Sequence, residues 1–154
     1  MNDINLLKQT RAVLLQICTE SALSEEQLLF IPEGFRNNIL WNLGHLIVTQ
    51  QILHYRRTGQ EMYISPYLVN QFRRGTSPAD WENTPDISDL LPLLMDLPNK
   101  LEEDYQAGKL KTYEKLTTST GVVLSNIEEA ISYNNFHEGL HMGVLLSMKK
   151  LLPH

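Results

Sequence analysis

The sequence has a single cysteine, no long apolar run and no excess of basic residues, and each of these absences excludes a class of protein. One thiol, Cys18, cannot form an internal disulfide, so nothing indicates an oxidising compartment. No apolar run approaches the roughly 20 residues that a membrane-spanning helix needs. The formal net charge of −5 argues against nucleic acid or an anionic membrane as the main partner.

The first residues of the chain also lack the basic start and the apolar core of a secretory signal peptide, so we expect a cytoplasmic protein. A length of 154 residues is about the size of one domain and is enough to bury a core. No internal repeat or low-complexity tract divides the chain, and we interpret residues 1–154 as one domain. Cys18 lies in an apolar-periodic segment, where a core residue is a better interpretation than a nucleophile.

Apolar residues at helical spacing predict four long helices, and the segments between them carry cap and breaker residues. The sequence SEEQ at 24–27 and the sequence SNIE at 125–128 match the capping-box pattern, with serine as the cap in each. Asn37 or Asn38 can cap the second long helix. Pro98 falls inside the third, where we expect a kink or a break. The expected helices span residues 3–20, about 38–57, about 88–106 and about 125–151.

The second long helix is apolar on two sides, which is typical of a helix surrounded by protein. Residues 58–87, which follow it, show no periodicity apart from a short helix near PYLVNQF. A connection of this length is typical of a bundle whose chain must cross from one end to the other. The sequence therefore predicts an all-α fold, a four-helix bundle with a long crossover between the second and third main helices.

Two histidines, His137 and His141, are four residues apart in the last predicted helix. At about 100° per residue, both fall on the apolar arc of that helix and face the core. Imidazole is a common metal ligand, and a pair at this spacing can supply two nitrogens to one ion. A core histidine is also often only a hydrogen-bonded packing residue, and the spacing alone leaves both interpretations open.

A third ligand would have to come from elsewhere in the chain, and His45 and His54 lie on nearly opposite sides of the second long helix. His45 is the better candidate because it lies deep in an apolar segment, whereas His54 is interpreted as a hydrogen-bonded core residue. His154 is the last residue and is not favoured. Glu138, about 100° from His137, is a candidate acid–base or supporting group, although we place it toward the flank of the helix.

Polar and aromatic neighbours of these histidines allow two interpretations. Asn42 and Thr49 lie one turn on either side of His45 and can orient it by hydrogen bonds, or they can be polar residues at a helix interface. Trp41 and Tyr133 are interpreted as packing residues rather than as parts of a substrate pocket.

Two long stretches resemble the DinB-like superfamily, which includes YfiT-type metal hydrolases and metal-dependent thiol transferases. They are LSEEQLLFIPEGFRNNILWNLGHLIVTQQIL and SNIEEAISYNNFHEGLHMGVLLSMKKLL. The segments FRRG and SPADW between them resemble the family's crossover in length and position. The resemblance implies a four-helix bundle in which one histidine of the second helix and two of the fourth bind a divalent cation. Transferred to this sequence, the ligands are His45, His137 and His141.

The resemblance further implies a metal that activates a low-molecular-weight thiol or water against an electrophilic small-molecule substrate. The expected activity is therefore that of a thiol S-transferase or a related hydrolase, with Zn, Ni or Fe as the ion, while Cu also suits three imidazoles. Arg73 and Arg74 are candidates for binding an anionic thiol, with a solvated charge pair as the alternative. The competing hypothesis is a non-catalytic bundle that binds metal or a partner.

Two further hypotheses follow from the helical pattern. A histidine phosphotransfer bundle needs one exposed histidine, and the candidates here point inward, so this function is less favoured. Apolar stripes on several helix faces are compatible with a homodimer, although the sequence indicates no particular interface.

Overall fold

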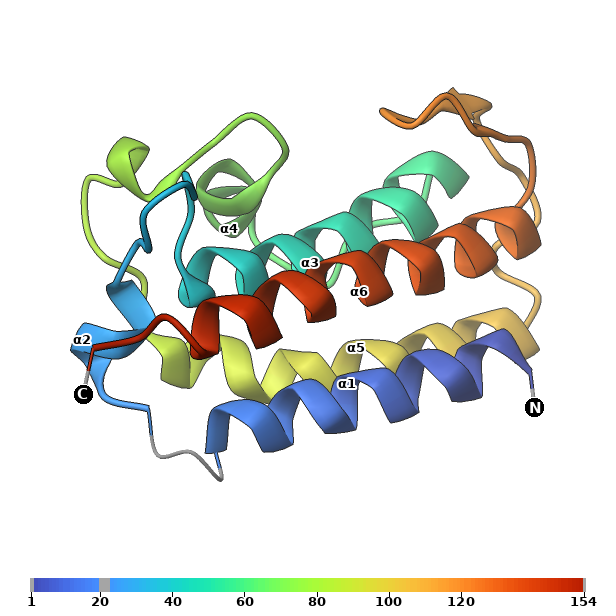
Figure 1. Ribbon diagram of the computed structural model, residues 1–154. Helices are drawn as coiled ribbons and strands as arrows, with labels where there is room; N and C mark the ends of the chain where they lie inside the picture. Colours follow the sequence, from blue (N-terminus) through green and yellow to red (C-terminus); the bar gives the residue numbers. More distant parts are fainter. Residues whose placement is uncertain (1, 20–22, 154) are drawn as a thin grey trace.

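Four long helices run side by side in the computed structural model, which describes residues 2–19 and 23–153 (Figure 1). Helices α3 and α6 form one pair and α1 and α5 form the other. The described part of the chain is thus an all-α bundle, as the sequence predicts. The four helices are α1 (Asp3–Thr19), α3 (Ile39–His54), α5 (Ile87–Gln106) and α6 (Ile127–Lys149).

A long crossover returns the chain to the end of the bundle at which α3 began, so α3 and α5 run in the same direction (Figure 1). The crossover contains the short helices η1 (Arg56–Thr58), α4 (Pro66–Phe72) and η2 (Pro78–Asp80). Helix α4 packs on α3, where the Phe72 side chain is fully buried. The predicted connection between the second and third main helices is confirmed, and it positions α4 over the middle of α3.

Side-chain caps begin several of the helices, including α2 (Glu25–Leu29), α3 and α6. Ser24 and Gln27 form the expected capping box of α2, and Asn38 caps α3 by accepting a hydrogen bond from the backbone of Trp41. The predicted cap of the last helix is wrong by one residue. Asn126, rather than Ser125, accepts the hydrogen bond from the Glu129 backbone at 2.8 Å, and the Ser125 N–H donates to the Glu129 carboxylate at 2.7 Å.

Helix α5 is unbroken from Ile87 to Gln106, so of the kink or break expected at Pro98 the break does not occur. Proline removes one backbone hydrogen bond and usually kinks or ends a helix. Here Leu94, Leu97 and Leu101, on both sides of Pro98, are buried against the rest of the bundle. This packing stabilises the helix on both sides of the lost hydrogen bond.

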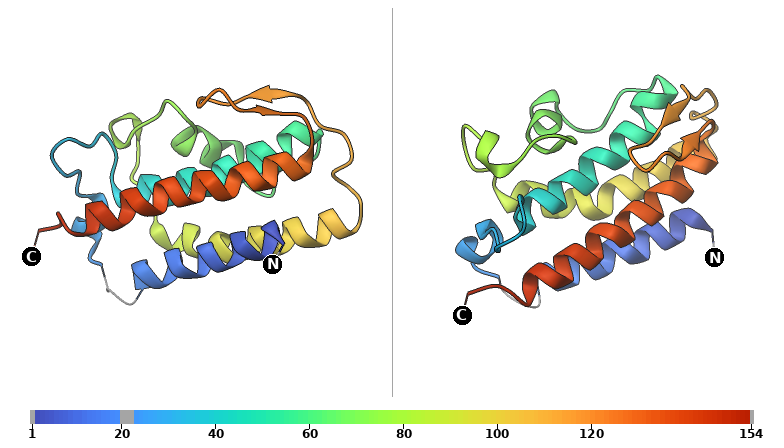
Figure 2. Two further views of the ribbon diagram at one scale, coloured as in Figure 1. Left: turned by 45° about the vertical axis from the view of Figure 1, so that its right-hand side comes forward. Right: turned by 45° about the horizontal axis from the view of Figure 1, so that its top comes forward.

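A short antiparallel hairpin joins α5 to α6 and was not predicted. Strands β1 (Leu116–Thr117) and β2 (Val123–Leu124) have two residues each, which is too short for a periodic pattern in the sequence. The hairpin lies over the end of the bundle where α6 begins (Figure 2).

Within the bundle, Cys18 is 8% exposed, and burial raises the pKa of its thiol to about 11. A neutral, buried thiol agrees with its interpretation as a core residue. Among the described residues, no helix has both the length and the apolar character that crossing a bilayer requires.

Asp104, near the end of α5, connects the crossover to the bundle. Its carboxylate accepts hydrogen bonds from the hydroxyls of Tyr55 and Tyr63 at 3.0 and 2.9 Å and from the Lys109 ammonium at 2.6 Å. Burial opposes ionisation of Asp104, but the hydrogen bonds from Lys109, Tyr63 and Tyr55 outweigh it and lower the pKa of the carboxyl. Asp104 therefore stabilises the fold in its charged form.

Replacing Asp104 with asparagine is expected to lower the free energy of unfolding at pH 7 by about 1.5–3 kcal/mol, the range for hydrogen bonds to a charged group. Because the pKa is lower in the folded state, this stabilisation is present above the unfolded-state pKa of about 4 and is lost as the pH falls below it. Urea unfolding of both proteins at pH 7 and in strong acid would measure it. A difference that does not shrink in acid would contradict the charged role of Asp104.

Candidate metal centre

His45 of α3 and His137 and His141 of α6 meet where the two helices pack together. The ring centroid of His45 lies 5.2 Å from that of His137 and 4.9 Å from that of His141, and the two α6 rings are 4.5 Å apart. One ring nitrogen from each residue can be chosen so that all three lie within 4.8 Å of one another. We call these three residues the histidine cluster, and a cluster of this kind could hold a metal ion.

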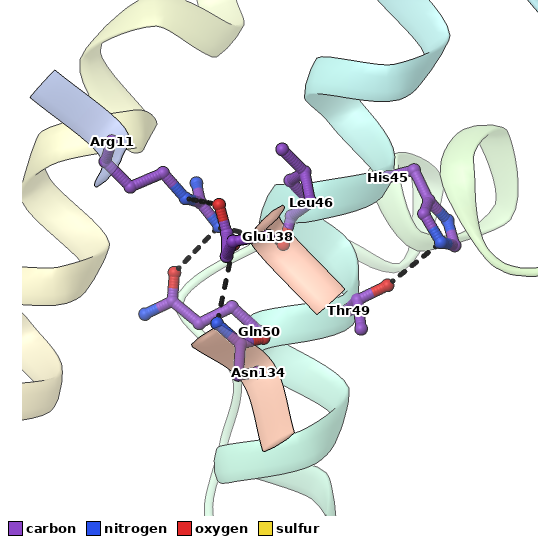
Figure 3. Close-up of polar contacts among 7 residues, drawn as sticks. All are labelled: Arg11, His45, Leu46, Thr49, Gln50, Asn134 and Glu138. Carbon is purple, nitrogen blue, oxygen red and sulfur yellow. Dashed lines mark hydrogen bonds and ion pairs between the residues drawn. The ribbon is translucent and has the colours of Figure 1, made fainter. Parts of the chain in front are cut away.

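The orientation of His45 is set by the crossover. Its Nδ1 lies 2.8 Å from the carbonyl oxygen of Phe72, which can only accept, so Nδ1 carries the proton and Nε2 keeps its lone pair. Trp41 stacks on the other side of the ring, with centroids 4.6 Å apart and planes 11° from parallel. The Thr49 hydroxyl lies 3.3 Å from Nε2 (Figure 3). These contacts leave the His45 ring one orientation.

His141 is oriented by Asn42, which the sequence had suggested as a partner of His45. Nδ1 of His141 lies 2.8 Å from Oδ1 of Asn42. The Asn42 amide nitrogen donates to the Asn38 carbonyl at 2.7 Å, so its oxygen must face the histidine. An oxygen there makes Nδ1 the protonated nitrogen and leaves Nε2 available as a ligand. Of the two interpretations of Asn42, the structure therefore favours a polar residue at the interface of α3 and α6 over one that orients His45.

His137 differs from the other two because its Nδ1 is buried and has no hydrogen-bond partner within residues 2–19 and 23–153. A buried polar nitrogen without a partner is costly and calls for an explanation. A metal ion bound by the cluster would supply one, since an imidazole nitrogen with a free lone pair is a ligand for Zn²⁺ and similar ions. The donor set thus fits a transition metal.

The histidines of the cluster are neutral at pH 7, which is the protonation state that binds metal. Burial lowers the pKa of His137 to about 3, with further lowering by His141, His45 and Arg11. Burial and the nearby His45 lower the pKa of His141 to about 4, and burial lowers the pKa of His45. No proton has to leave any of these rings before an ion binds at neutral pH.

A comparison with known protein families identifies the family to which the chain belongs. The model of the DinB superfamily matches residues 6–145, which is most of the sequence and includes all three members of the cluster. The chain belongs to the DinB superfamily. A comparison with curated proteins gave no match. The family assignment made from the two resembling stretches is therefore confirmed, and it agrees with the helical bundle of the structure.

Glu138 of this DinB-like protein lies in the core rather than on the flank of α6, so the expected placement is wrong. Its side chain is fully buried, and both carboxylate oxygens accept hydrogen bonds from Arg11 of α1, at 2.7 and 2.8 Å. The charge of the guanidinium draws the carboxylate inward from the flank. Arg11 was missed in the sequence, although it stands in the buried stripe of α1 between Leu7 and Leu14.

The remaining candidates lie outside the cluster. His54 is fully buried on the other side of α3, and burial lowers its pKa to about 3. It is a core residue, as expected, but neither of its ring nitrogens has a hydrogen-bond partner among the described residues, so the expected hydrogen bond is not found. Arg73 and Arg74 are exposed and directly follow Phe72. His154 lies outside the described residues.

The two aromatic residues that were interpreted as packing residues have different surroundings. Trp41 is 5% exposed and stacks on His45, so it packs within the centre itself. Tyr133 lies near the hairpin, with its hydroxyl 3.2 Å from that of Thr120.

Proposed function

We propose that this DinB-superfamily protein binds one divalent transition metal ion through His45, His137 and His141. The observation that supports the proposal is the convergence of three neutral imidazoles, with one nitrogen from each within 4.8 Å. Zn, Ni and Fe all accept such ligands, and the ligand type does not distinguish them.

We propose further that the protein is a metal-dependent transferase that uses a low-molecular-weight thiol, or a related hydrolase. A metal with three protein ligands retains open coordination positions, and it lowers the pKa of a bound water or thiol. The residues of this chain would orient the histidine ligands of such a metal. Phe72 and Asn42 hold the Nδ1 protons of His45 and His141, which leaves each Nε2 unprotonated. His137 and His141 are partly exposed, which would allow a small substrate to approach.

Arg73 and Arg74 are proposed to contact the anionic groups of such a thiol. Both side chains are exposed at the end of α4. The residue before them, Phe72, binds His45 through its carbonyl oxygen, so the two arginines follow directly after a backbone contact to the cluster. Glu138 is not assigned a role in proton transfer, because both of its carboxylate oxygens are bound by Arg11.

A non-catalytic bundle that binds metal or a partner is the second candidate function. It is favoured by the position of a surface cavity of about 450 Å³, which is lined by Tyr55, Tyr63, Asp104 and Lys109 among others and by none of the cluster histidines. In this case the ion would stabilise the packing of α3 on α6, and no thiol would react at it.

Elemental analysis of the untagged protein, purified without chelator, tests the proposal. We expect about one equivalent of a transition metal, as one three-histidine site implies, and its loss in the His141→Ala variant because two imidazoles hold an ion poorly. His54→Ala is the matched control, since it removes a buried histidine of α3 outside the cluster and should retain the metal. The absence of metal from the wild-type protein, even after incubation with Zn²⁺ or Ni²⁺, would overturn the proposal.

Turnover of thiols with electrophilic substrates by the metal-loaded protein then separates the two functions. The transferase or hydrolase requires turnover that His141→Ala abolishes, whereas the non-catalytic bundle retains its metal without any turnover.

A further inference from the structure

An ion pair lies in the middle of the bundle, fully removed from solvent. Arg11 of α1 and Glu138 of α6 are both 0% exposed. Nε of the arginine donates to one carboxylate oxygen at 2.8 Å and Nη2 donates to the other at 2.7 Å, so the ion pair is bidentate (Figure 3). No part of this pair serves the ligands of the proposed metal directly.

A contribution to the stability of the fold does not by itself explain why Arg11 and Glu138 form a buried ion pair. Moving two charges out of water is costly, and well-packed apolar side chains of similar volume often stabilise a core equally well or better. In addition, Nη1 of Arg11 is buried and has no hydrogen-bond partner in the described part of the chain. An ion pair that is costly and incompletely satisfied invites another explanation.

The position of the Arg11–Glu138 pair beside the histidine cluster supplies this explanation. Glu138 directly follows His137 on α6 and precedes His141 by three residues. Nη2 of Arg11 also donates to the backbone carbonyl of Leu46 at 3.0 Å, and Leu46 directly follows His45 on α3. One guanidinium therefore binds both elements that carry the cluster, in each case at the residue next to a histidine.

Two longer contacts extend this connection along the same helices. Oε1 of Gln50, one turn beyond Leu46 on α3, lies 3.5 Å from Nη2 of Arg11, and the Asn134 amide, one turn before Glu138 on α6, lies 3.4 Å from the carboxylate. The polar contacts thus follow the interface of α3 and α6 on the side that faces α1 (Figure 3).

We infer that Arg11 and Glu138 are positioning residues for the histidine cluster, which hold α3 and α6 at the spacing where the imidazoles of His45, His137 and His141 converge. Neither side chain is hydrogen-bonded to a cluster imidazole, so the two residues act through the helices. The inference rests on the proposed metal function, and it adds that the first helix, which contributes no ligand, sets the affinity of the centre.

The double variant Arg11→Met/Glu138→Met tests the inference, because it removes both charges, keeps a similar volume and leaves no unpaired ion. Co²⁺ is the probe, titrated into the full-length protein against a competing chelator and followed by its visible absorption. We expect a folded variant whose Kd for Co²⁺ rises about 10–100-fold, the usual effect of removing groups that orient ligands, with an altered absorption spectrum. Far-UV circular dichroism and the melting temperature report the fold separately.

Leu101→Ala is the matched control. Leu101 is fully buried in α5, in the core cluster of the bundle that includes Leu7 and Leu53 and none of the cluster histidines. Its truncation should lower the melting temperature and leave the Kd for Co²⁺ unchanged. A Kd that rises as much in this variant as in the double variant would mean that general loosening weakens the site, and the inference would be overturned.

A double variant that binds Co²⁺ as tightly as the wild-type protein would show the pair to be a core contact only. A wild-type protein that binds no Co²⁺ would overturn the metal function itself, an outcome visible before any variant is made. Where the double variant does not fold, Arg11→Lys replaces it, since lysine keeps the charge but loses the paired geometry. Weaker Co²⁺ binding by this variant supports the inference, and unchanged binding overturns it.

Discussion

Replacing Glu138 with alanine is expected to lower the free energy of unfolding by about 3–5 kcal/mol, because it leaves the Arg11 guanidinium buried without its counterion. A guanidinium remains charged in proteins, and the Arg11 side chain has no contact with solvent at 0% exposure. For a chain of this size each kcal/mol changes the melting temperature by roughly 2–4 °C, so the expected decrease is roughly 6–20 °C. Urea and thermal unfolding followed by circular dichroism would measure it.

Glu102→Ala is the matched control for this loss. Glu102 also pairs with a residue of α1, Lys8, at 2.6 Å, but the two side chains are 30% and 23% exposed. Water screens a partly exposed pair, and its removal should cost no more than about 1 kcal/mol. Equal losses in the two variants would mean that burial does not set the strength of the Arg11–Glu138 interaction.

Replacing Gly44 with alanine should destabilise the bundle, although alanine is the better helix former. In the interior of a helix the exchange is expected to stabilise by about 1 kcal/mol. A Cβ at Gly44 would clash with ring carbons of Phe72, whose side chain is fully buried. Overpacking typically costs about 1–3 kcal/mol, so after the helix-propensity gain we expect a net loss of stability of up to about 2 kcal/mol.

The same change reaches the candidate metal centre, since the Phe72 carbonyl holds the Nδ1 proton of His45. Displacement of Phe72 should therefore also weaken Co²⁺ binding. Gly139→Ala is the control, because Gly139 is also helical and a Cβ there would meet nothing within 4 Å. It should gain stability, by about 0.5–1 kcal/mol, and keep its metal affinity. A Gly44→Ala protein that gains stability in the same way would contradict the close contact with Phe72.

The long helices could be predicted from the sequence because their apolar residues recur at one spacing over many turns. The same regularity placed His137 and His141 on the inner face of α6 and distinguished His45 from His54 on α3. The packing of side chains between helices could not be predicted from this regular spacing. A kink or a break was expected at Pro98, and only the burial of its neighbours explains why α5 continues without a break.

The Arg11–Glu138 ion pair shows a second limit of prediction from the sequence. Arg11 stands where a leucine would fit the buried stripe of α1, and Glu138 stands in the buried stripe of α6. A charged residue inside an apolar stripe predicts a buried partner of opposite charge, so each half could have been suspected. Their pairing could not, because the two residues are 127 positions apart in the chain.

The long separation of these partners has a consequence for how the protein matures. The Asn42–His141 hydrogen bond spans 99 residues and the Arg11–Glu138 pair spans 127, so neither exists until α6 has left the ribosome. Until then α3 exposes apolar surface on two sides, and Arg11 has no counterion. A nascent chain that ends before α6 therefore has only one of the three cluster histidines, His45. The proposed ion could meet all three ligands only after the last helix has closed the bundle.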